Sequence, residues 1–386
     1  MEFKLSEEHK AVQQAARDFA QSRLLDGVIE RDTHMQPPTE QVKEMGELGF
    51  MGIMTSEKYN GSGMDTLSYV LALEEISKID ASTAVIMSAH NSLALWAIEV
   101  YGTEAQKEKY LKPLAVGKSI GCFCLSEPEA GSDASMQRTT AEDKGDYYLM
   151  NGVKNWITNG GNADFQLVIA QTNPEKKHRG INAFIVEKSW KGVTIGPKED
   201  KLGIRSSDTH SISYSDVVVP RENRIGEDGF GFKLAMQILE GGRIGIAAQA
   251  LGIAAGAYEL AAQYATERKA FGKAIIEHQG VAFKLAEMVM DIEAARMLVY
   301  RAAYLKDQGM PYGYASAMAK LKASEVAMKH TIEAVQVHGG NGYVKEYHVE
   351  RFMRDAKITQ IYEGTSEIHK VIIARNISKG ELSLAI

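Results

Sequence analysis

Apolar side chains recur at helical spacing along the first third of the chain. Two such runs are Val70, Leu71, Leu73, Ile76 and Ile79, and then Val85, Ile86, Leu93, Leu95 and Ile98. The second run carries little charge, so we expect its helix to be buried on most sides. Ser6, with Glu8 and a polar/apolar repeat after it, is typical of a helix start. The pattern predicts a helical region from Leu5 to about Gly117.

Near Ser119 the pattern changes to short apolar runs at strand-like spacing, separated by Asp, Asn, Gly, Lys and Pro. The runs are residues 120–125, 147–150, 153–157, 167–170, 183–186, 193–195, 211–214 and 217–219. Asn151-Gly152 lies between two of them and is typical of a two-residue hairpin turn. We expect a closed or sandwiched antiparallel sheet that ends near residue 228.

From Phe230 to about Lys379 the helical pattern returns in long segments. They cover residues 231–267, 279–308, 314–338, 349–355 and 366–377. Long helices joined by short connections favour an antiparallel bundle. The sequence therefore predicts an α+β protein of three domains: an N-terminal helical domain (1–118), a middle antiparallel β-barrel or sandwich (119–228) and a C-terminal antiparallel four-helix bundle (229–386).

Composition excludes several classes of protein. The 386 residues are 45% hydrophobic and 24% charged, which is ordinary globular usage and excludes a disordered chain. The net charge is −6 without long blocks of like charge, so we expect no nucleic-acid partner. The most apolar stretch, Ile244–Ala262, is interrupted by Gln249 and Glu259, so we expect no membrane span. The opening MEFKLSEEHK is charged and polar, without a signal or transit pattern, which predicts a cytoplasmic protein.

The common cofactor and catalytic motifs are absent from the sequence. It has no G-x-G-x-x-G after a strand, no P-loop, no H-E-x-x-H and no G-x-S-x-G. Its His and Cys residues do not have metal-ligand spacing, so we expect no metal site. Cys122 and Cys124 share one face of a strand, where buried packing is the expected role.

Five segments carry a resemblance to a known family. They are LSEPEAGSD (125–133), WITN (156–159), ERKAFG (267–272), QVHGGNGY (336–343) and RDAKITQIYEGTSE (354–367). In order and spacing they resemble the acyl-CoA dehydrogenases, and the resemblance covers essentially the whole chain. A further segment, EGGRIGIA (240–247), resembles the short-chain, butyryl-CoA type more than the medium-chain type.

The resemblance implies a reaction and its cofactor. In this family a base removes the α-proton of an acyl-CoA thioester, and the β-hydrogen leaves as hydride to N5 of FAD. The product is a trans-2-enoyl-CoA, and the electrons pass to electron-transfer flavoprotein. A weakly acidic C–H requires a carboxylate in a dry pocket and hydrogen-bond donors on the thioester oxygen.

By resemblance, Glu363 is the base. Without it, a solvated Glu before a helix N-terminus would be the ordinary interpretation. Apolar Ile361 and Tyr362 precede Glu363 and Gly364 follows it, which favours a carboxylate in a packed wall with a pKa raised by burial. Some relatives place the base where this chain has Gly242, so Glu363 has no rival there.

The same resemblance assigns further residues to FAD and to the substrate. Those expected at FAD are Phe123, Leu125, Ser126, Ser132, Trp156, Ile157, Thr158, Arg268, Phe271, Gln279, Gln336, Gly339, Gly340, Thr365 and Glu367. Those expected at the acyl-CoA are Ser132, Glu240, Arg243, Tyr362 and Gly364. For Trp156 a core anchor, for Ser132 a turn, for Arg268 a solvated face and for Arg243 a packing role remain alternatives.

In the family, the residue matched by Arg268 reaches the flavin diphosphate across a subunit boundary, and Phe271 and Gln279 come from the same neighbouring chain. The resemblance therefore implies a homo-oligomer, usually a tetramer built from two dimers.

Three positions bear on the substrate. Ala84 stands where glutaryl-CoA relatives place an Arg, which argues against a dicarboxylyl thioester. Trp96 either shortens the acyl pocket or faces the core, and Glu129 stands where many relatives carry Gly. A medium-chain or branched short-chain dehydrogenase, an oxidase of the same fold, and a non-catalytic CoA-ester or flavin-binding homologue remain alternatives.

Overall fold

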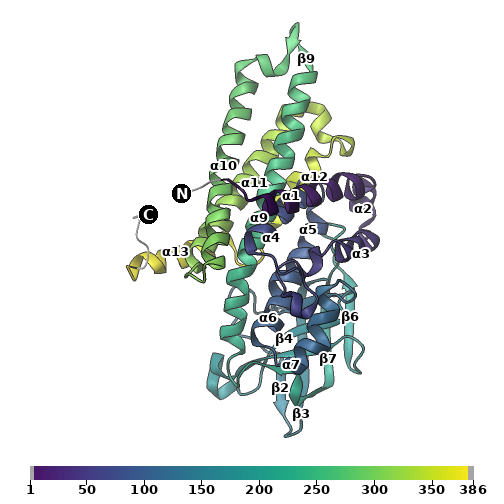
Figure 1. Ribbon diagram of the computed structural model, residues 1–386, viewed down its shortest axis with the longest axis vertical. Helices are drawn as coiled ribbons and strands as arrows, with labels where there is room; N and C mark the ends of the chain where they lie inside the picture. Colours follow the sequence, from purple (N-terminus) through teal and green to yellow (C-terminus); the bar gives the residue numbers. More distant parts are fainter. Residues whose placement is uncertain (1–3, 381–386) are drawn as a thin grey trace.

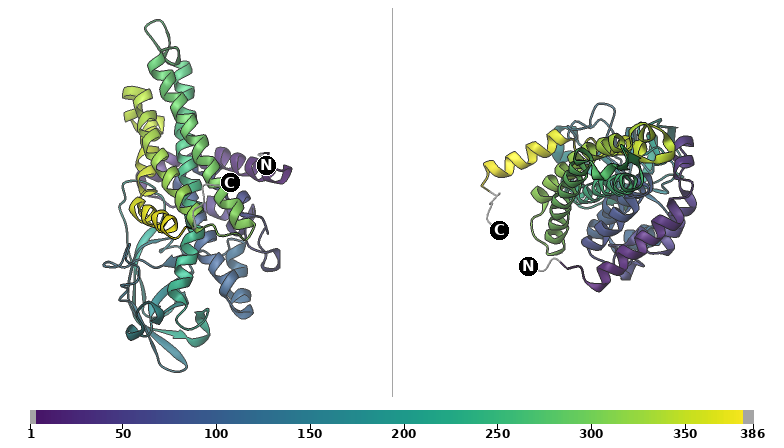
Figure 2. Two further views of the ribbon diagram at one scale, coloured as in Figure 1. Left: turned by 90° about the vertical axis from the view of Figure 1, so that its left-hand side faces the viewer. Right: turned by 90° about the horizontal axis from the view of Figure 1, so that it is seen from above.

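The computed structural model describes residues 4–380 and shows three domains along one long axis (Figures 1 and 2). The N-terminal helices lie beside the middle of the molecule, the β domain forms one end and a long helical hairpin forms the other. This confirms the predicted α+β class and the α, β, α order of the domains.

The N-terminal domain is helical throughout. Its elements are α1 (Glu7–Phe19), α2 (Val28–His34), α3 (Thr39–Glu47), α4 (Thr66–Ser77), α5 (Ala81–Ser88), α6 (Trp96–Tyr101), α7 (Glu104–Gln106) and α8 (Lys112–Ala115), with π-helical turns at Ala20–Leu24, Ala89–Leu95 and Lys107–Leu111. Ser6 caps α1, because its side chain accepts a hydrogen bond from the His9 N–H. Every residue of α5 is buried, as its lack of charge predicts.

The β domain is one eight-stranded sheet. Its strands are β1 (Gly121–Cys124), β2 (Thr140–Asp143), β3 (Tyr147–Thr158), β4 (Phe165–Gln171), β5 (Ile181–Glu187), β6 (Val193–Lys198), β7 (Thr209–Pro220) and β8 (Arg224–Ile225), in the order β6-β7-β3-β2-β4-β5-β8. Most neighbours are antiparallel, but β1 pairs with β4 in parallel, as β2 does at one position, so the purely antiparallel expectation is corrected. Cys122 and Cys124 are buried on β1, with their Sγ atoms 3.7 Å apart.

The predicted hairpin at Asn151-Gly152 is wrong. Strand β3 runs straight through these two residues, and its pairing with β7 shifts register there. The Asn151 amide donates to Asp216 Oδ1 at 3.0 Å, and the Asp216 N–H donates back to Asn151 Oδ1 at 2.8 Å. Long β7 pairs with both halves of β3, so Asn-Gly forms a bulge in a continuous strand instead of a turn.

The C-terminal helices match the predicted segments closely. They are α9 (Gly231–Glu267), α10 (Gln279–Asp307), α11 (Gly313–His338), α12 (Val349–Ile358) and α13 (Ser366–Ser378), with a two-stranded ribbon of β9 (Lys269–Ala270) and β10 (Lys273–Ala274) between α9 and α10. By length and composition alone, α9 is apolar enough to cross a membrane, but 83% of its most apolar window is buried inside the protein. That burial explains its composition.

The N-terminal domain packs against the long central helix α9. A Cβ built on Gly252 would lie 2.4 Å from the Glu74 carbonyl oxygen, and one on Gly256 would lie 2.4 Å from that of Lys78. These two glycines therefore let the end of α4 approach the backbone of α9. The approach fixes the N-terminal helices against the helix that carries Glu240 and Arg243.

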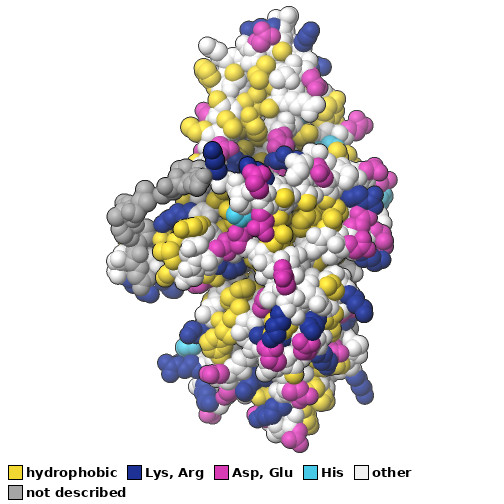
Figure 3. Space-filling view, in the orientation of Figure 1, with side chains coloured by type: hydrophobic (Ala, Val, Ile, Leu, Met, Phe, Trp, Pro, Cys, Tyr) yellow, Lys and Arg dark blue, Asp and Glu magenta, His cyan; other side chains and the backbone are white. Residues whose placement is uncertain are grey.

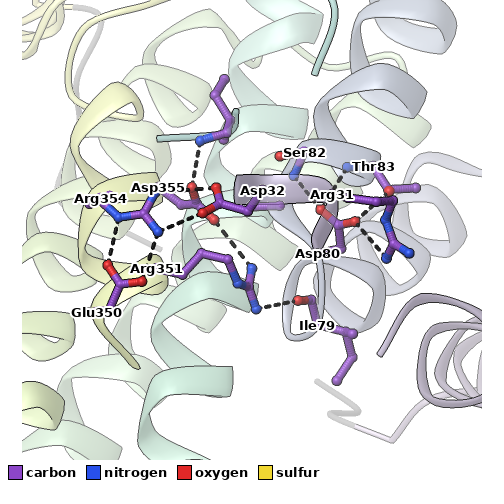
Figure 4. A network of polar contacts seen from close by, with 12 residues as sticks. Arg31, Asp32, Ile79, Asp80, Ser82, Thr83, Glu350, Arg351, Arg354 and Asp355 are labelled. Atoms are coloured by element: carbon purple, nitrogen blue, oxygen red, sulfur yellow. Dashed lines mark hydrogen bonds and ion pairs between the residues drawn. The ribbon is translucent and has the colours of Figure 1, made fainter. Parts of the chain in front are cut away.

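A network of ion pairs holds α12 against the other two domains (Figure 4). The Arg354 guanidinium pairs with Asp32 on α2 at 2.7 Å. Asp355 accepts a hydrogen bond of 2.5 Å from the Ile204 N–H in the β domain and pairs with Arg351 at 3.4 Å. Burial raises the pKa of Asp355 to about 6, against the charge of Arg351. Because α12 leads directly into the Glu363 segment, this network anchors the start of the site.

Candidate active site

Glu363 lies in the tight connection between α12 and α13. The Tyr362 N–H donates to the Ile358 carbonyl at 3.1 Å, which closes a turn at the end of α12. Glu363 and Gly364 then take left-handed backbone angles, with φ of 51° and 101°. Thr365 caps α13 by accepting from the Ile368 N–H. This connection turns the Glu363 side chain back toward α9.

The Glu363 carboxylate faces Gly242. A Cβ built on Gly242 would lie 2.2 Å from Glu363 Oε2 and 2.7 Å from a methyl carbon of Leu93. Oε2 is buried and has no hydrogen-bond partner among the described residues. Burial raises the pKa of Glu363 to about 7, and the charges of Lys320 and Arg243 oppose that rise. A carboxylate with a pKa near neutrality and a free oxygen is suited to take a proton.

Tyr362 is fixed by a chain of hydrogen bonds. Its hydroxyl donates to Gln249 Oε1 on α9, and the Gln249 amide donates to the Ala81 carbonyl at 2.8 Å. Burial raises the pKa of Tyr362, so the hydroxyl stays protonated. The chain ties the residue next to Glu363 to α9 and to the start of α5.

Arg243 and Glu240 lie on α9 near Glu363. Arg243 is buried and its Nε has no partner within residues 4–380. Burial lowers the pKa of Arg243, against the negative charges of Glu240 and Glu363. Burial likewise raises the pKa of Glu240, and a Cβ on Gly313 would lie 2.9 Å from its Oε1. Glu240 therefore lies beside the start of α11, and Arg243 places a positive charge near the carboxylate.

In the β domain, the loop after β1 is held against β3. The Asn155 N–H donates to the Ser126 carbonyl at 2.8 Å. The fully buried Lys154 amine donates to the Leu125 carbonyl at 3.0 Å and to the Glu127 carboxylate at 2.7 Å. Glu127 also accepts from the backbone of the residues after the loop, at positions 138 and 139. Leu125 and Ser126 are therefore brought next to the WITN segment.

Sequence reasoning missed Lys154 and Glu127. A lysine at an inward-facing position of a strand is rare unless it is paired, so the alternation of β3 held the signal. Only the folded chain shows that its partner comes from the loop after β1. This pair adds a buried side-chain attachment between the loop and β3 to the backbone hydrogen bond from Asn155 to Ser126.

Trp156 stands at a second irregularity in β3. The pairing with β7 shifts between Lys154 and Ile157, Trp156 has a φ of 61°, and its side chain is 62% exposed. It is therefore not a core anchor. Thr158 and Phe123 are half-buried. The side chain of Ile157 packs into the core, which leaves only its backbone for a ligand.

The loop position Ser132 is exposed, and so is the neighbouring Glu129. Glu129 pairs with Arg138 at 2.5 Å, with both side chains mostly in solvent. Glu129 is therefore a solvated loop carboxylate. Trp96 is half-buried and its ring contacts Tyr101 edge-on at 5.9 Å, whereas Leu93 on the preceding turn is the residue that reaches Gly242.

Six predicted residues lie far from the β domain, at the opposite end of the long axis of the molecule (Figure 1). The exposed Arg268, Phe271 and Gln279 lie at or next to the β9–β10 tip, and Gln336, Gly339 and Gly340 lie at the nearby end of α11 (Figure 1). The Asn341 amide donates to the Tyr264 hydroxyl at 2.9 Å, which joins the ends of α9 and α11. One chain thus does not bring these residues to its own β domain.

The predicted residues in the β domain and those near the β9–β10 tip have side chains suited to bind a long ligand that is partly aromatic and partly anionic. Phe271 is 96% exposed, and the Arg268 guanidinium makes no ion pair within the described chain. Nothing lies within 4 Å of a Cβ built on Gly339 or Gly340, so a ligand can approach their backbone. An aromatic face at Trp156 and a guanidinium at the far end suit a planar ring and a diphosphate.

Three descriptions of one family match the chain in order. The acyl-CoA dehydrogenase N-terminal domain matches residues 6–118, the middle domain 122–217 and the C-terminal domain 229–378. With the fold and the Glu363 site, these matches define the class of protein: the chain belongs to the acyl-CoA dehydrogenase family. The resemblance carried by the five sequence segments is confirmed.

The curated relatives are similar over nearly the whole chain. The short-chain specific acyl-CoA dehydrogenase of Clostridium acetobutylicum is 52% identical over 377 residues, covering 98% of this chain and 100% of that protein. The human mitochondrial short-chain specific enzyme is 47% identical, covering 97% and 90%.

Solved structures show the same likeness. Butyryl-CoA dehydrogenase from Megasphaera elsdenii has a TM-score of 0.96 at 49% identity, covering 98% of this chain and 100% of that one. A chain from a structure described as the electron transferring flavoprotein of Acidaminococcus fermentans has a TM-score of 0.97 at 49% identity, covering 98% and 99%.

Proposed function

We propose that this enzyme oxidises short-chain acyl-CoA thioesters such as butyryl-CoA to trans-2-enoyl-CoA, with FAD as cofactor and Glu363 as the base. The observation that carries the proposal is the Glu363 carboxylate, buried against Gly242 with Oε2 unpartnered and a pKa raised to about 7. The short-chain relatives of about 50% identity support the class of substrate.

In this proposal, Glu363 and its neighbours have separate roles in proton removal and in stabilising the thioester oxygen. Glu363 Oε2 takes the α-proton, and the buried Leu93 and half-buried Tyr362 side chains shield it from water. The Glu363 N–H makes no hydrogen bond within residues 4–380, so it is available to the thioester oxygen, where negative charge develops. When bound, FAD accepts the β-hydrogen as hydride at N5. The α-proton remains on Glu363, and the substrate has thus lost one proton and one hydride.

The residues present fit FAD in two groups. Phe123, Ser126, Trp156 and Thr158 would hold the flavin ring, because Trp156 offers an exposed aromatic face beside the fixed loop after β1. Arg268, Phe271, Gln279, Gln336, Gly339 and Gly340 would hold the diphosphate and adenosine of a neighbouring chain, since one chain separates the two groups along its long axis.

That separation supports a homo-oligomer in which a second chain completes each FAD site, and the family resemblance implies a tetramer built from two dimers. Apolar side chains gather on the upper helical part of the face in Figure 3. Exposed large apolar side chains on the α9–α10 connection and on α10 are Phe271, Phe283, Val289, Met290, Met297 and Tyr304. Helix α13 extends outward from the body and exposes Val371 and Ile377 (Figures 1 and 2). Patches of this kind are typical of protein interfaces.

We further propose that the reduced enzyme passes its electrons to an electron-transfer flavoprotein. The likeness to a chain from the Acidaminococcus fermentans structure supports this partner.

The test is an anaerobic visible spectrum of the purified, FAD-loaded enzyme before and after addition of butyryl-CoA. Bleaching of the flavin bands, with a long-wavelength charge-transfer band, is the expected result. Glu363→Gln should keep the flavin spectrum and ligand binding but lose bleaching, because an amide cannot take the proton. Bleaching by Glu363→Gln at the normal rate would overturn the base, and bleaching only by longer or branched thioesters would overturn the short-chain substrate.

A further inference from the structure

A buried lysine lies directly behind the Glu363 segment. Lys320 on α11 has no exposed surface, and its amine donates to the Gly364 carbonyl at 2.6 Å. Within residues 4–380 the structure gives this amine no other hydrogen bond. Burying an amine with a single acceptor is costly, so a structural role would be served better by an apolar side chain of similar size. The position therefore points to a role for the amine itself.

The segment that Lys320 holds is conformationally unusual. Glu363 and Gly364 both have left-handed backbone angles, and Gly364 has a φ that side chains rarely adopt. Such a segment keeps its shape only when its surroundings fix it. The Lys320–Gly364 hydrogen bond fixes the carbonyl immediately after the residue that carries the carboxylate.

Lys320 also interacts electrostatically with the charged groups around it. Burial lowers the pKa of Lys320 to about 7, Glu363 and Glu367 oppose that fall, and Arg243 adds to it. In return, the cation lowers the pKa of Glu363. His369 on α13 is fully buried beside Gly364 with both ring nitrogens unpartnered, and burial lowers its pKa to about 3. His369 is therefore neutral and does not compete.

The phenols of Tyr69 and Tyr362 also lie close enough to interact electrostatically with Glu363, but burial raises the pKa of both, so they remain uncharged. Within residues 4–380, Lys320 and Arg243 are thus the cations that act on the carboxylate. Arg243 lies on α9, on the carboxylate side of the segment, whereas Lys320 holds its backbone from α11.

We propose that Lys320 is a positioning residue for the base: its amine fixes the Glu363–Gly364 backbone, and its positive charge keeps the Glu363 carboxylate ionised. The inference rests on the proposed role of Glu363. Lys320 touches neither substrate nor flavin in this scheme and acts only through the base.

The test compares Lys320→Met with Lys320→Arg and with Lys322→Met, all as FAD-loaded enzymes. Lys322 is the matched control, because it lies on the same helix, half-exposed, and pairs with Asp291 at 3.5 Å. Single-turnover flavin reduction by butyryl-CoA is measured against pH, with flavin content and melting temperature measured in parallel.

For Lys320→Met we expect the rate of reduction to fall by about tenfold or more, with butyryl-CoA affinity changed by less than about threefold, since small displacements of a reacting group are costly. The acid limb should move up by about one pH unit, because a cation near the base is lost. A purely structural lysine would not move this limb. Lys320→Arg should keep the limb in place, and Lys322→Met should behave as wild type.

An unmoved acid limb in Lys320→Met, or an equal shift in Lys322→Met, would overturn the inference. If Lys320→Met does not fold, the inference is decided by Lys320→Arg and Lys320→Gln: the charge-keeping variant must hold the limb and the neutral one must move it. Glu363→Gln separates the two proposals. If that variant still reduces its flavin, the base assignment is wrong; if it is inactive while Lys320→Met matches wild type, only the role of Lys320 is wrong.

Discussion

The Glu363 carboxylate packs directly against the backbone of Gly242, where a Cβ would lie only 2.2 Å from Glu363 Oε2. Real Cβ atoms do not approach oxygen this closely, so the space for the carboxylate exists because α9 has no side chain at this point. The segment that carries Glu363 and helix α9 are far apart in sequence, and they pack together here because Gly242 leaves room for the Glu363 carboxylate.

Gly242→Ala should therefore displace the carboxylate. We expect flavin reduction by butyryl-CoA to slow by about 10- to 100-fold, because a displacement of about 1 Å in a reacting group has effects of this size. Flavin content should be unchanged. Gly241→Ala is the matched control, since its Cβ would meet nothing closer than 3.9 Å. Equal rates in the two variants would show that the contact does not control the base.

The rate of flavin reduction should depend on the protonation of Glu363. Its pKa is raised to about 7, chiefly by burial, so the base form is lost as the pH falls below that value. We expect the single-turnover rate to fall about tenfold per unit on the acid side. Measuring reduction without an added electron acceptor keeps the acceptor's own pH dependence out of the profile. An acid limb near the ordinary value for glutamate would contradict the burial argument.

The raised pKa also makes a stability prediction. The ionised carboxylate is less favourable in the folded than in the unfolded protein. The stability that Glu363 contributes is therefore complete below its ordinary pKa of about 4.5 and is lost as the pH rises through about 7. Glu363→Gln should melt a few degrees above wild type at pH ~8 and level with it at pH ~4, where Glu363 is neutral in both the folded and the unfolded protein. Glu367→Gln, at an exposed carboxylate, should show no such gain.

Lys154→Met should weaken FAD binding. It removes the amine that holds the Leu125 carbonyl and leaves the buried Glu127 carboxylate without its cation. Breaking a buried pair costs about 3–5 kcal/mol, so both the melting temperature and the flavin content should fall.

Two comparisons make the Lys154 prediction specific. Lys154→Met with Glu127→Gln should recover part of the stability, because no unpaired charge remains. Arg138→Ala breaks only the exposed pair with Glu129 and should cost less than about 1 kcal/mol. A loss as large in Arg138→Ala would show that the loop, not the buried pair, is responsible.

Arg268→Ala should lower FAD affinity without unfolding the protein, because the exposed guanidinium makes no ion pair in its own chain. The measurement is flavin content after dialysis, together with the mass of the assembly in solution. Lys269→Ala at the next exposed position is the control. Unchanged flavin content in Arg268→Ala would contradict the cross-chain placement of this residue.

Local patterns of apolar and polar residues were enough to predict the domain order and the long helices. The segments expected at 231–267, 279–308 and 314–338 are found at 231–267, 279–307 and 313–338, because helical periodicity is a local property that α9, α10 and α11 do not need tertiary contacts to reveal. The motif around Glu363 was equally visible, since its residue types are adjacent in the chain.

The strand continuity at Asn151-Gly152, the partners of the buried lysines and the space around Glu363 depend on tertiary packing. Asn151-Gly152 has a strong local preference for a turn, but pairing with the whole of β7 overrides it. The partners of Lys154 and Lys320, at Glu127 and Gly364, are 27 and 44 residues away in the chain. No local pattern specifies such contacts, because they depend on how separate elements pack. The space opposite Gly242 and the distance between Trp156 and Arg268 arise in the same way, from packing and from the length of α9.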